Sequence, residues 1–399
     1  MCSFRDHTGS QWVIMEAKSQ LQTKIFRKIE EIPPQEWLSV FPGVLENYYF
    51  FKALDESGFD QFSFFYIIVY DNGVPVGATS CFLMDFPFDI MVNGPLKTIL
   101  TFVKKILPNI LSPRVLICGL PMSQGRIGMV GLSALVMEAI YGCMEKIAQD
   151  ELAAVLMFKD FACTYDSVFE PFLKKGFLKI ESLPSTIMDI DFADFDGYLK
   201  TLSPVSRQDI KRKFKKIDGR VKIDLEVTNA PDDSALSEIY RLYLQTFDKQ
   251  DMGMEKLTPD FFKHISRNMP QEAKYFLWRI EGKLVAFALC FVSKEYFIDY
   301  YLGFDYSVAY QYYLYFVRFR DLMKWCIARG IKKYEMGSTT YEPKRRLGFD
   351  FIRLYFYMKH RNKLINPFIG IVSRFIKPEN FDPVFKEMKK AGNSSPAAS

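Results

Sequence analysis

A short basic run near the end of the chain holds the side chains best suited to chemistry. Lys344, Arg345 and Arg346 follow Tyr341 in the segment Tyr341-Glu-Pro-Lys-Arg-Arg-Leu-Gly-Phe349. A lysine ammonium has three donors and a positive charge, so Lys344 could stabilise an oxyanion, a phosphate or a leaving group. Tyr341 could add a hydroxyl donor. The alternative is that the run is a solvated basic face at a helix end and that Tyr341 is a packed ring.

Two carboxylates precede this run and could act as bases. Asp299 lies in the apolar segment Tyr296-Phe-Ile-Asp-Tyr-Tyr-Leu302, and Glu335 ends the strand that leads to Gly337-Ser338. Burial raises the pKa of a carboxyl group, so such a group can take a proton from an attacking amine. A structural ion pair explains Asp299 equally well, because an unpaired carboxylate in an apolar strand is costly.

The composition excludes several other kinds of active site. The chain has three histidines, which lie far apart, and seven cysteines without a Cys-x-x-Cys pair. These cannot supply a zinc cluster or a Ser-His-Asp triad, so we expect no metal site. The net charge of +5 comes without a long basic run, so we expect no DNA partner.

Length and hydropathy indicate a globular protein of two domains. Of the 399 residues, 49% are hydrophobic and 25% are charged, which is enough to form large cores. No apolar stretch reaches the roughly 18 residues of a membrane span, and the N-terminus does not resemble a signal peptide. With its scattered cysteines, the chain is expected to be cytoplasmic, with peripheral contact at the inner membrane face as an alternative.

A weak internal repeat organises the chain. Each half is predicted to contain a hairpin, then a long helix, then a short strand. The paired segments are 62–83 and 275–292 for the hairpins, 132–149 and 308–329 for the helices, and 153–158 and 333–336 for the strands.

The sharpest repeat pairs Phe169-Glu-Pro-Phe-Leu-Lys-Lys-Gly-Phe177 with the basic segment 341–349. Its offset is shorter than that of the hairpins, which predicts an insertion near 86–120 in the first half. We therefore predict domains at 24–195 and 196–380, with residues 1–23 and 389–399 disordered. Within the insertion, residues 95–111 are apolar at helical spacing, as is the stretch 364–376. Each could be a packing helix, a wall for an acyl chain or a lipid contact.

The order of elements in each half predicts an α/β (α+β layered) fold with a mixed, mostly antiparallel sheet flanked by helices. This order resembles the GNAT fold. GNAT enzymes typically carry a tyrosine followed by three residues and then a Gly-Phe pair, and that tyrosine can protonate the leaving thiolate of coenzyme A. Phe172 stands at the tyrosine position before Gly176-Phe177, and Lys344 stands there before Gly348-Phe349. The second copy is therefore expected to carry the chemistry.

Most of residues 24–370 resemble two double-GNAT families: the BioF-like acetyltransferases and the FemAB-like peptidoglycan aminoacyl ligases. The resemblance is most specific in the last hundred residues, which contain the motifs from Tyr301-Leu-Gly-Phe to Gly348-Phe349. The resemblance implies an acyltransferase that moves an acyl group from acyl-CoA, a co-substrate and not a permanent cofactor, to a small or lipid-linked amine. One alternative is a ligase that takes an aminoacyl group from tRNA to a cell-wall precursor. Another is a non-catalytic module that binds peptidoglycan or a protein. The chain lacks the long coiled-coil arm of several such ligases, which favours acyl-CoA.

The resemblance and the residue chemistry together predict the site. The catalytic residues are expected to be Lys344, Tyr341, Glu335 and Asp299. Expected acyl-CoA contacts are Arg345, Arg346, Ser338, Gln124, Gly125 and Gly128, and expected substrate contacts are Arg207 and Tyr301. The loop before the second long helix, 305–310, has no glycine, whereas 124–131 is glycine-rich at a spacing different from the usual GNAT pyrophosphate loop.

Overall fold

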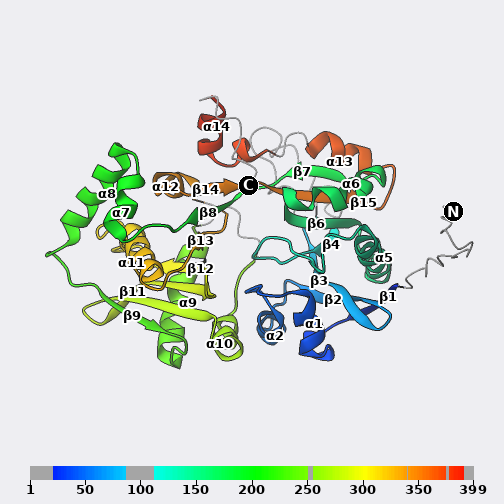
Figure 1. Ribbon diagram of the computed structural model, residues 1–399, viewed down its shortest axis with the longest axis horizontal. Coiled ribbons are helices and arrows are strands. Elements are labelled where there is room, and N and C mark those ends of the chain that lie inside the picture. The colour runs from blue at the N-terminus through cyan, green and yellow to red at the C-terminus, as the bar shows by residue number, and fades with distance from the viewer. Residues whose placement is uncertain (1–20, 87–111, 250–254, 339, 374–376, 391–399) are drawn as a thin grey trace, which may run out of the picture.

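The computed structural model describes residues 21–86, 112–249, 255–338, 340–373 and 377–390. Within them, two mixed, mostly antiparallel sheets flanked by helices lie side by side (Figure 1). The α/β fold class predicted from the sequence is therefore confirmed.

The first half contributes strands and helices in an order that matches the predicted hairpin, helix and strand. Its elements are β1 (Leu21–Phe26), η1 (Ile29–Glu31), α1 (Pro34–Val40), α2 (Tyr48–Glu56), β2 (Ser63–Asp71), β3 (Val74–Asp85), β4 (Arg114–Cys118), β5 (Gly128–Met129), α5 (Ala134–Asp150), β6 (Val155–Ala162), η3 (Cys163–Tyr165), α6 (Asp166–Lys174), β7 (Leu178–Glu181) and β8 (Ser185–Asp189).

The second half repeats the hairpin, long helix and short strand. Its elements are α7 (Phe195–Thr201), α8 (Pro204–Ile217), β9 (Asp224–Thr228), α9 (Asp233–Phe247), α10 (Pro259–Asn268), β10 (Ala273–Ile280), β11 (Lys283–Val292), β12 (Tyr296–Phe304), α11 (Leu314–Ala328), β13 (Lys333–Glu335), α12 (Tyr341–Arg346), β14 (Asp350–Ile352), β15 (Leu354–His360), α13 (Asn366–Ser373), η4 (Pro378–Asn380) and α14 (Pro383–Lys390).

The two halves exchange a strand. The first sheet runs β1-β2-β3-β4-β6-β15-β7, so β15 from the end of the chain lies between two strands of the first half. The second sheet runs β14-β8-β13-β12-β11-β10-β9, so β8 from the first half lies inside it. In Figure 1, β15 in orange lies beside β6 and β7. The predicted division at 195/196 therefore does not separate the two sheets, because sequence repeats show which segments match but not where strands pair.

The same turn geometry closes both predicted hairpins. Asn72 and Gly73 have φ values of 50° and 82°, and Glu281 and Gly282 have φ values of 50° and 79°. Two consecutive residues with positive φ define the type I′ turn, whose twist suits a two-residue hairpin.

The repeated Gly-Phe pair ends a helix in each half. Gly176 follows α6 with a φ of 88°, and Gly348 follows α12 with a φ of 81°. Residues with such positive φ values at helix C-termini are commonly glycines. The following Phe177 and Phe349 are buried, so much of the repeated motif is explained by helix termination and packing.

One apolar core spans both halves. On α2, the Phe50 ring contacts Phe291 of β11 and Tyr300 of β12, with ring centroids 5.7 and 5.8 Å apart. The same cluster of buried residues includes strands β2 to β4 and helices α9 and α10. Burial of this shared surface stabilises the two halves as one unit.

Three predicted boundaries are wrong. Residues 21–23 belong to β1, where Leu21 to Phe26 pair with β2, and are not disordered. At the other end, residues 389–390 belong to α14. The second long helix begins at Leu314, because residues 308–313 form turns and Tyr313 has a φ of 47°. The apolar segment 95–111 lies outside the described residues.

Among the described residues, no helix combines the length and hydropathy required of a membrane span.

Candidate functional site

Strands β12 and β13 separate at the centre of the second sheet. They pair in parallel only from Tyr296 to Ile298 and from Lys333 to Glu335. Beyond this point β12 continues to Phe304 along β11, whereas β13 ends. We call the place after Ile298 and Glu335 the divergence point. A sheet opened in this way leaves backbone groups and side chains without a neighbouring strand.

Glu335 lies at the divergence point and is held by both halves. It is 5% exposed. Its Oε1 accepts hydrogen bonds from Gln124 Nε2 at 2.5 Å and Ser185 Oγ at 3.0 Å, and its Oε2 accepts from the Tyr296 hydroxyl at 3.0 Å. Burial raises the pKa of Glu335 above its usual value, although the nearby Arg126 guanidinium opposes the rise. Glu335 is therefore suited to exchange a proton nearer neutral pH than an exposed glutamate.

Lys344 lies just beyond the divergence point, on α12. Its side chain is buried, and Nζ donates hydrogen bonds to the carbonyl oxygens of Met336 at 2.7 Å and Gly337 at 2.8 Å. Burial lowers the pKa of Lys344 to about 7. An ammonium has three N–H donors, so one remains for a reacting group after these two bonds are made.

The equivalent residue of the first half has a different environment. Phe172 is buried among Phe158, Phe169 and Phe177. Lys344 is also buried but ends in an ionisable amine, so the interpretation of a solvated basic face does not describe it. An uncompensated buried lysine is costly, and the two carbonyl acceptors offset part of that cost.

Arg345 and Arg346 do lie on a solvated face. Their side chains are 41% and 52% exposed, and both donate to Glu342, at 2.7 Å from Arg345 Nη2 and 2.7 Å from Arg346 Nε. Ser338 Oγ makes a 3.5 Å contact to the carbonyl oxygen of Leu183. Arg345 and Arg346 therefore each bind the Glu342 carboxylate, in place of the anionic group of acyl-CoA predicted from the sequence.

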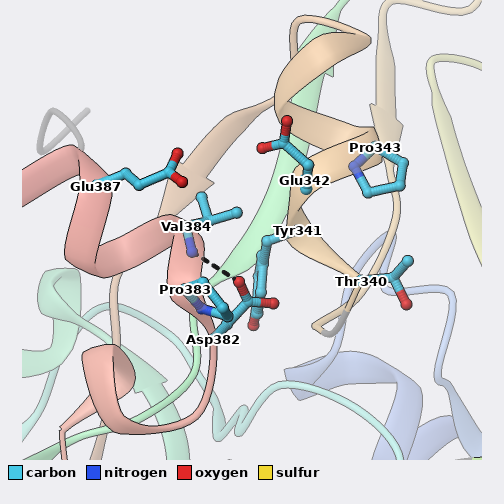
Figure 2. A pocket seen from close by; sticks show the side chains of 8 residues that line it. All are labelled: Thr340, Tyr341, Glu342, Pro343, Asp382, Pro383, Val384 and Glu387. Atoms are coloured by element: carbon cyan, nitrogen blue, oxygen red, sulfur yellow. Dashed lines mark hydrogen bonds between the residues drawn. The ribbon is translucent and has the colours of Figure 1, made fainter.

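Tyr341 serves packing more than proton transfer. Its hydroxyl donates to the carbonyl oxygen of Pro184 at 2.8 Å, and its ring contacts Phe351 and Phe385. On its outer side, α12 and α14 enclose an open hollow of about 400 Å³ (Figure 2). The residues lining this hollow are Thr340, Tyr341, Glu342, Pro343, Asp382, Pro383, Val384 and Glu387, and they include neither Lys344 nor Glu335.

Asp299 is half of a buried ion pair. Its Oδ2 accepts from Arg318 Nη1 at 2.5 Å and from the Tyr334 hydroxyl at 3.0 Å. Arg318 is fully buried, and the Asp299 side chain is 1% exposed. These contacts favour the structural interpretation of Asp299, which leaves Glu335 as the better-placed base.

The glycine-rich segment 124–131 packs closely and does not form an open cradle. The Gly125 amide donates to the carbonyl oxygen of Asp160 at 3.0 Å. A Cβ at Gly125 would lie 2.2 Å from the carbonyl oxygen of Lys159, and one at Gly128 would lie 2.6 Å from the Phe41 ring. Close packing thus explains both glycines, while Gln124 reaches Glu335.

The two predicted substrate contacts lie in different places. Arg207 is on α8, a basic helix that packs on α11, and its Nη1 contacts the carbonyl oxygen of Lys200 at 3.4 Å. Tyr301 lies between the halves, and its hydroxyl donates to Glu255 Oε1 at 3.1 Å. Burial raises the pKa of Glu255 to about 7.

Sequence reasoning missed the residues of the first half that face Glu335. Glu46 is 3% exposed, and its Oε1 accepts from Ser123 Oγ at 2.6 Å. Arg126 lies near enough to Glu46 and Glu335 for both carboxylates to raise its pKa. These residues occupy loops with no repeat counterpart, and isolated polar residues in a loop give no signal before the fold is known.

The chain is similar to several known proteins. Residues 205–345 match the family described as acetyltransferase (GNAT) domain. A curated protein of two Mycobacterium tuberculosis strains, named "Putative 8-amino-7-oxononanoate synthase 2", is 24% identical over 329 residues. That match covers 79% of this chain but 42% of the relative, so the chain spans less than half the relative's length.

Among solved structures, that of FemX is similar, with a TM-score of 0.56 and 13% identity. The match covers 88% of this chain and all of that chain, and at this identity it shows the fold alone. Residues 205–345 thus match a GNAT acetyltransferase domain, and the FemX-like fold agrees with the resemblance to double-GNAT proteins predicted from the sequence motifs.

Proposed function

We propose that the protein is an N-acyltransferase that moves an acyl group from acyl-CoA to an amine at the divergence point. The observation that carries this proposal is the pairing of a buried carboxylate with a buried lysine at the end of β13. Glu335 and Lys344 both have pKa values moved toward neutrality by burial. Such a pair can accept one proton and supply another in the same reaction.

The proposed reaction balances with these two groups. The amine nitrogen attacks the thioester carbon, a C–N bond forms and the C–S bond breaks. Glu335 takes the proton that the amine loses, and the free N–H of the Lys344 ammonium supplies a proton to the leaving thiolate. The products are an amide and free coenzyme A. A lysine with a pKa of about 7 is a stronger acid than an ordinary lysine, which favours this second transfer.

A second candidate is an aminoacyl ligase that takes its acyl group from charged tRNA and adds it to a cell-wall precursor. The observation that favours it is the basic helix α8, on which Lys211 and Arg212 are exposed and Arg207 is half-buried. Cationic residues on one helix face can bind a phosphate backbone. Lys344 and Glu335 would act on the oxygen ester of charged tRNA in the same way as on the thioester of acyl-CoA.

A small or lipid-linked acceptor fits the proposal. On the C-terminal segment, Leu364 and Ile371 are 89% and 55% exposed, and they could contact lipid or a long acyl chain. Peripheral membrane contact is therefore part of the proposal for a lipid-linked acceptor.

The test is release of free thiol from acetyl-CoA and palmitoyl-CoA with a panel of primary amines, beside charged tRNA as the alternative donor. We expect amine-dependent thiol release that Lys344→Met abolishes, Glu335→Gln lowers by about 100-fold or more and Glu387→Gln leaves unchanged. Transfer from charged tRNA alone would establish the ligase, and turnover with neither donor would favour a non-catalytic binding module.

A further inference from the structure

Strand β8, from the first half of the chain, contacts the surroundings of both proposed catalytic residues. It lies between β14 and β13 in the second sheet (Figure 1). The Ser185 hydroxyl donates to Glu335 Oε1 at 3.0 Å, and the next residue, Thr186, donates to the carbonyl oxygens that bind Lys344. Successive side chains of a strand point to opposite faces of a sheet, so one strand can serve two different groups.

Thr186 and Lys344 share their hydrogen-bond acceptors. The Thr186 hydroxyl donates to the Met336 carbonyl oxygen at 2.5 Å and lies 3.3 Å from that of Gly337. Lys344 Nζ donates to the same two oxygens at 2.7 and 2.8 Å. A carbonyl oxygen has two lone pairs, so these two donors use the full capacity of the Met336 oxygen. A change at the Thr186 hydroxyl therefore acts directly on the acceptors of Lys344.

Backbone pairing holds the Met336 carbonyl in place independently of this hydroxyl. The Met336 amide donates to the Thr186 carbonyl oxygen at 2.9 Å, and Thr186 pairs with Phe351 of β14. The Thr186 side chain is 0% exposed, so no water replaces its hydroxyl as a matter of course. Because valine has nearly the shape of threonine, Thr186→Val removes one hydrogen-bond donor and leaves the backbone acceptors where they are.

The Thr186 hydroxyl competes with the Lys344 ammonium for these oxygens. It presents the positive end of the O–H dipole to them and occupies a lone pair of the Met336 oxygen. Hydrogen bonds to the charged form of a group favour that form, so weaker acceptors favour the neutral amine. Burial acts in the same direction and lowers the pKa of Lys344 to about 7.

We propose that Thr186 is a positioning residue that weakens the hold of the Met336 and Gly337 carbonyls on the Lys344 ammonium and so favours release of its proton to the leaving thiolate. Ser185 has the complementary effect, because its hydrogen bond favours the carboxylate form of Glu335. This inference rests on the proposed function and adds to it a residue that acts through Lys344.

The experiment is a pH titration of Lys344 by NMR in the full chain labelled with ¹³C at lysine Cε, with Lys344→Met to identify the signal. We expect a midpoint near pH 7 in the wild type, and a midpoint about 0.5–1 pH unit higher in Thr186→Val. Thr186→Ala also lacks the hydroxyl and should show the same upward shift. Thr186→Ser keeps the hydroxyl and should titrate as the wild type does.

Thr79→Val is the matched control. Thr79 is also 0% exposed, but it lies on β3 of the first sheet, so loss of its hydroxyl should leave the Lys344 midpoint unchanged. A midpoint in Thr186→Val equal to or below that of the wild type would overturn the inference. An equal upward shift in Thr186→Ser or Thr79→Val would also overturn it, because the shift would then not depend on the Thr186 hydroxyl.

Thiol release gives a second readout. The basic limb of the kcat/KM profile should move to higher pH in Thr186→Val, whereas Ser185→Ala should move the acidic limb to higher pH, because Glu335 loses a donor. The NMR titration contains no acyl-CoA, so the expected Lys344 shift without thiol release in any variant contradicts only the proposed function. Thiol release with an unchanged basic limb in Thr186→Val contradicts only the role of Thr186.

Discussion

Gln124 of the first half donates its side-chain amide to Oε1 of Glu335, 211 residues further along the chain, at a distance of 2.5 Å. The carboxylate of the second half is thus oriented by a loop of the first. A hydrogen bond to a carboxylate stabilises its charged form. Gln124 is therefore a positioning residue for the proposed base, in place of the predicted acyl-CoA contact.

Gln124→Leu should move the pH dependence of transfer. Loss of the donor raises the pKa of Glu335 further, so the acidic limb of the kcat/KM profile should shift to higher pH. At high pH, where Glu335 is ionised in both proteins, the rates should converge. A uniform loss of activity at every pH would show that Gln124 acts in another way.

Glu335→Gln should lower kcat by about 100-fold or more, because a glutamine cannot accept the amine proton. In the wild type, the raised pKa of Glu335 means that activity is lost as the pH falls through that value, above the range of an exposed glutamate. The acidic limb should disappear from the residual activity of the variant. A profile with its acidic limb intact would assign the base to another residue.

Lys344→Met should abolish turnover and change how stability depends on pH. Between the folded pKa of about 7 and the unfolded value of 10.5, the unfolded chain binds a proton that the folded chain lacks. The Lys344 contribution to the unfolding free energy therefore rises with pH across this window, by at most about 1.4 kcal/mol per pH unit. Urea unfolding at pH 7.0 and 9.5 should show a smaller rise in the variant. Parallel pH dependence in both proteins would mean that Lys344 is charged throughout.

Asp299→Asn should act on stability. Removing the charge leaves the fully buried Arg318 without its ion-pair partner, which costs about 3–5 kcal/mol. Asp189→Asn, which breaks an exposed pair with Lys333, should cost less than about 1 kcal/mol. Denaturant unfolding measures the free energy of unfolding of both variants. Near-native stability of Asp299→Asn combined with lost turnover would restore Asp299 as a catalytic candidate.

Tyr341→Phe should retain wild-type kcat and lose about 1 kcal/mol of stability, because its hydroxyl makes a buried bond to the carbonyl oxygen of Pro184. Steady-state kinetics and thermal unfolding measure both effects. A large fall in kcat at unchanged stability would return the hydroxyl to the mechanism.

The sequence predicts the fold better than the connections between its parts. Hairpins, long helices and the Gly-Phe helix ends are local patterns, and residues such as Gly73 and Gly348 specify their own backbone geometry. The exchange of β8 and β15 depends on long-range pairing, for which a single sequence carries little signal.

In the candidate site, too, local patterns could be predicted from the sequence and long-range contacts could not. Lys344 and Glu335 could be predicted because one interrupts a repeated apolar motif and the other ends a strand. Glu46 and Arg126 could not, because only the packing of the two halves brings them close to Glu335. Arg345 could not be distinguished from Lys344, since adjacent positions on a six-residue helix point in different directions.

The position of β15 constrains how the protein is made. During synthesis, β6 and β7 leave the ribosome long before residues 354–360, so the gap between them in the first sheet stays open until these later residues are made. Until then both strands expose backbone edges that other chains can pair with. The nascent protein therefore has an extended window of vulnerability to aggregation, which closes when β15 completes the first sheet.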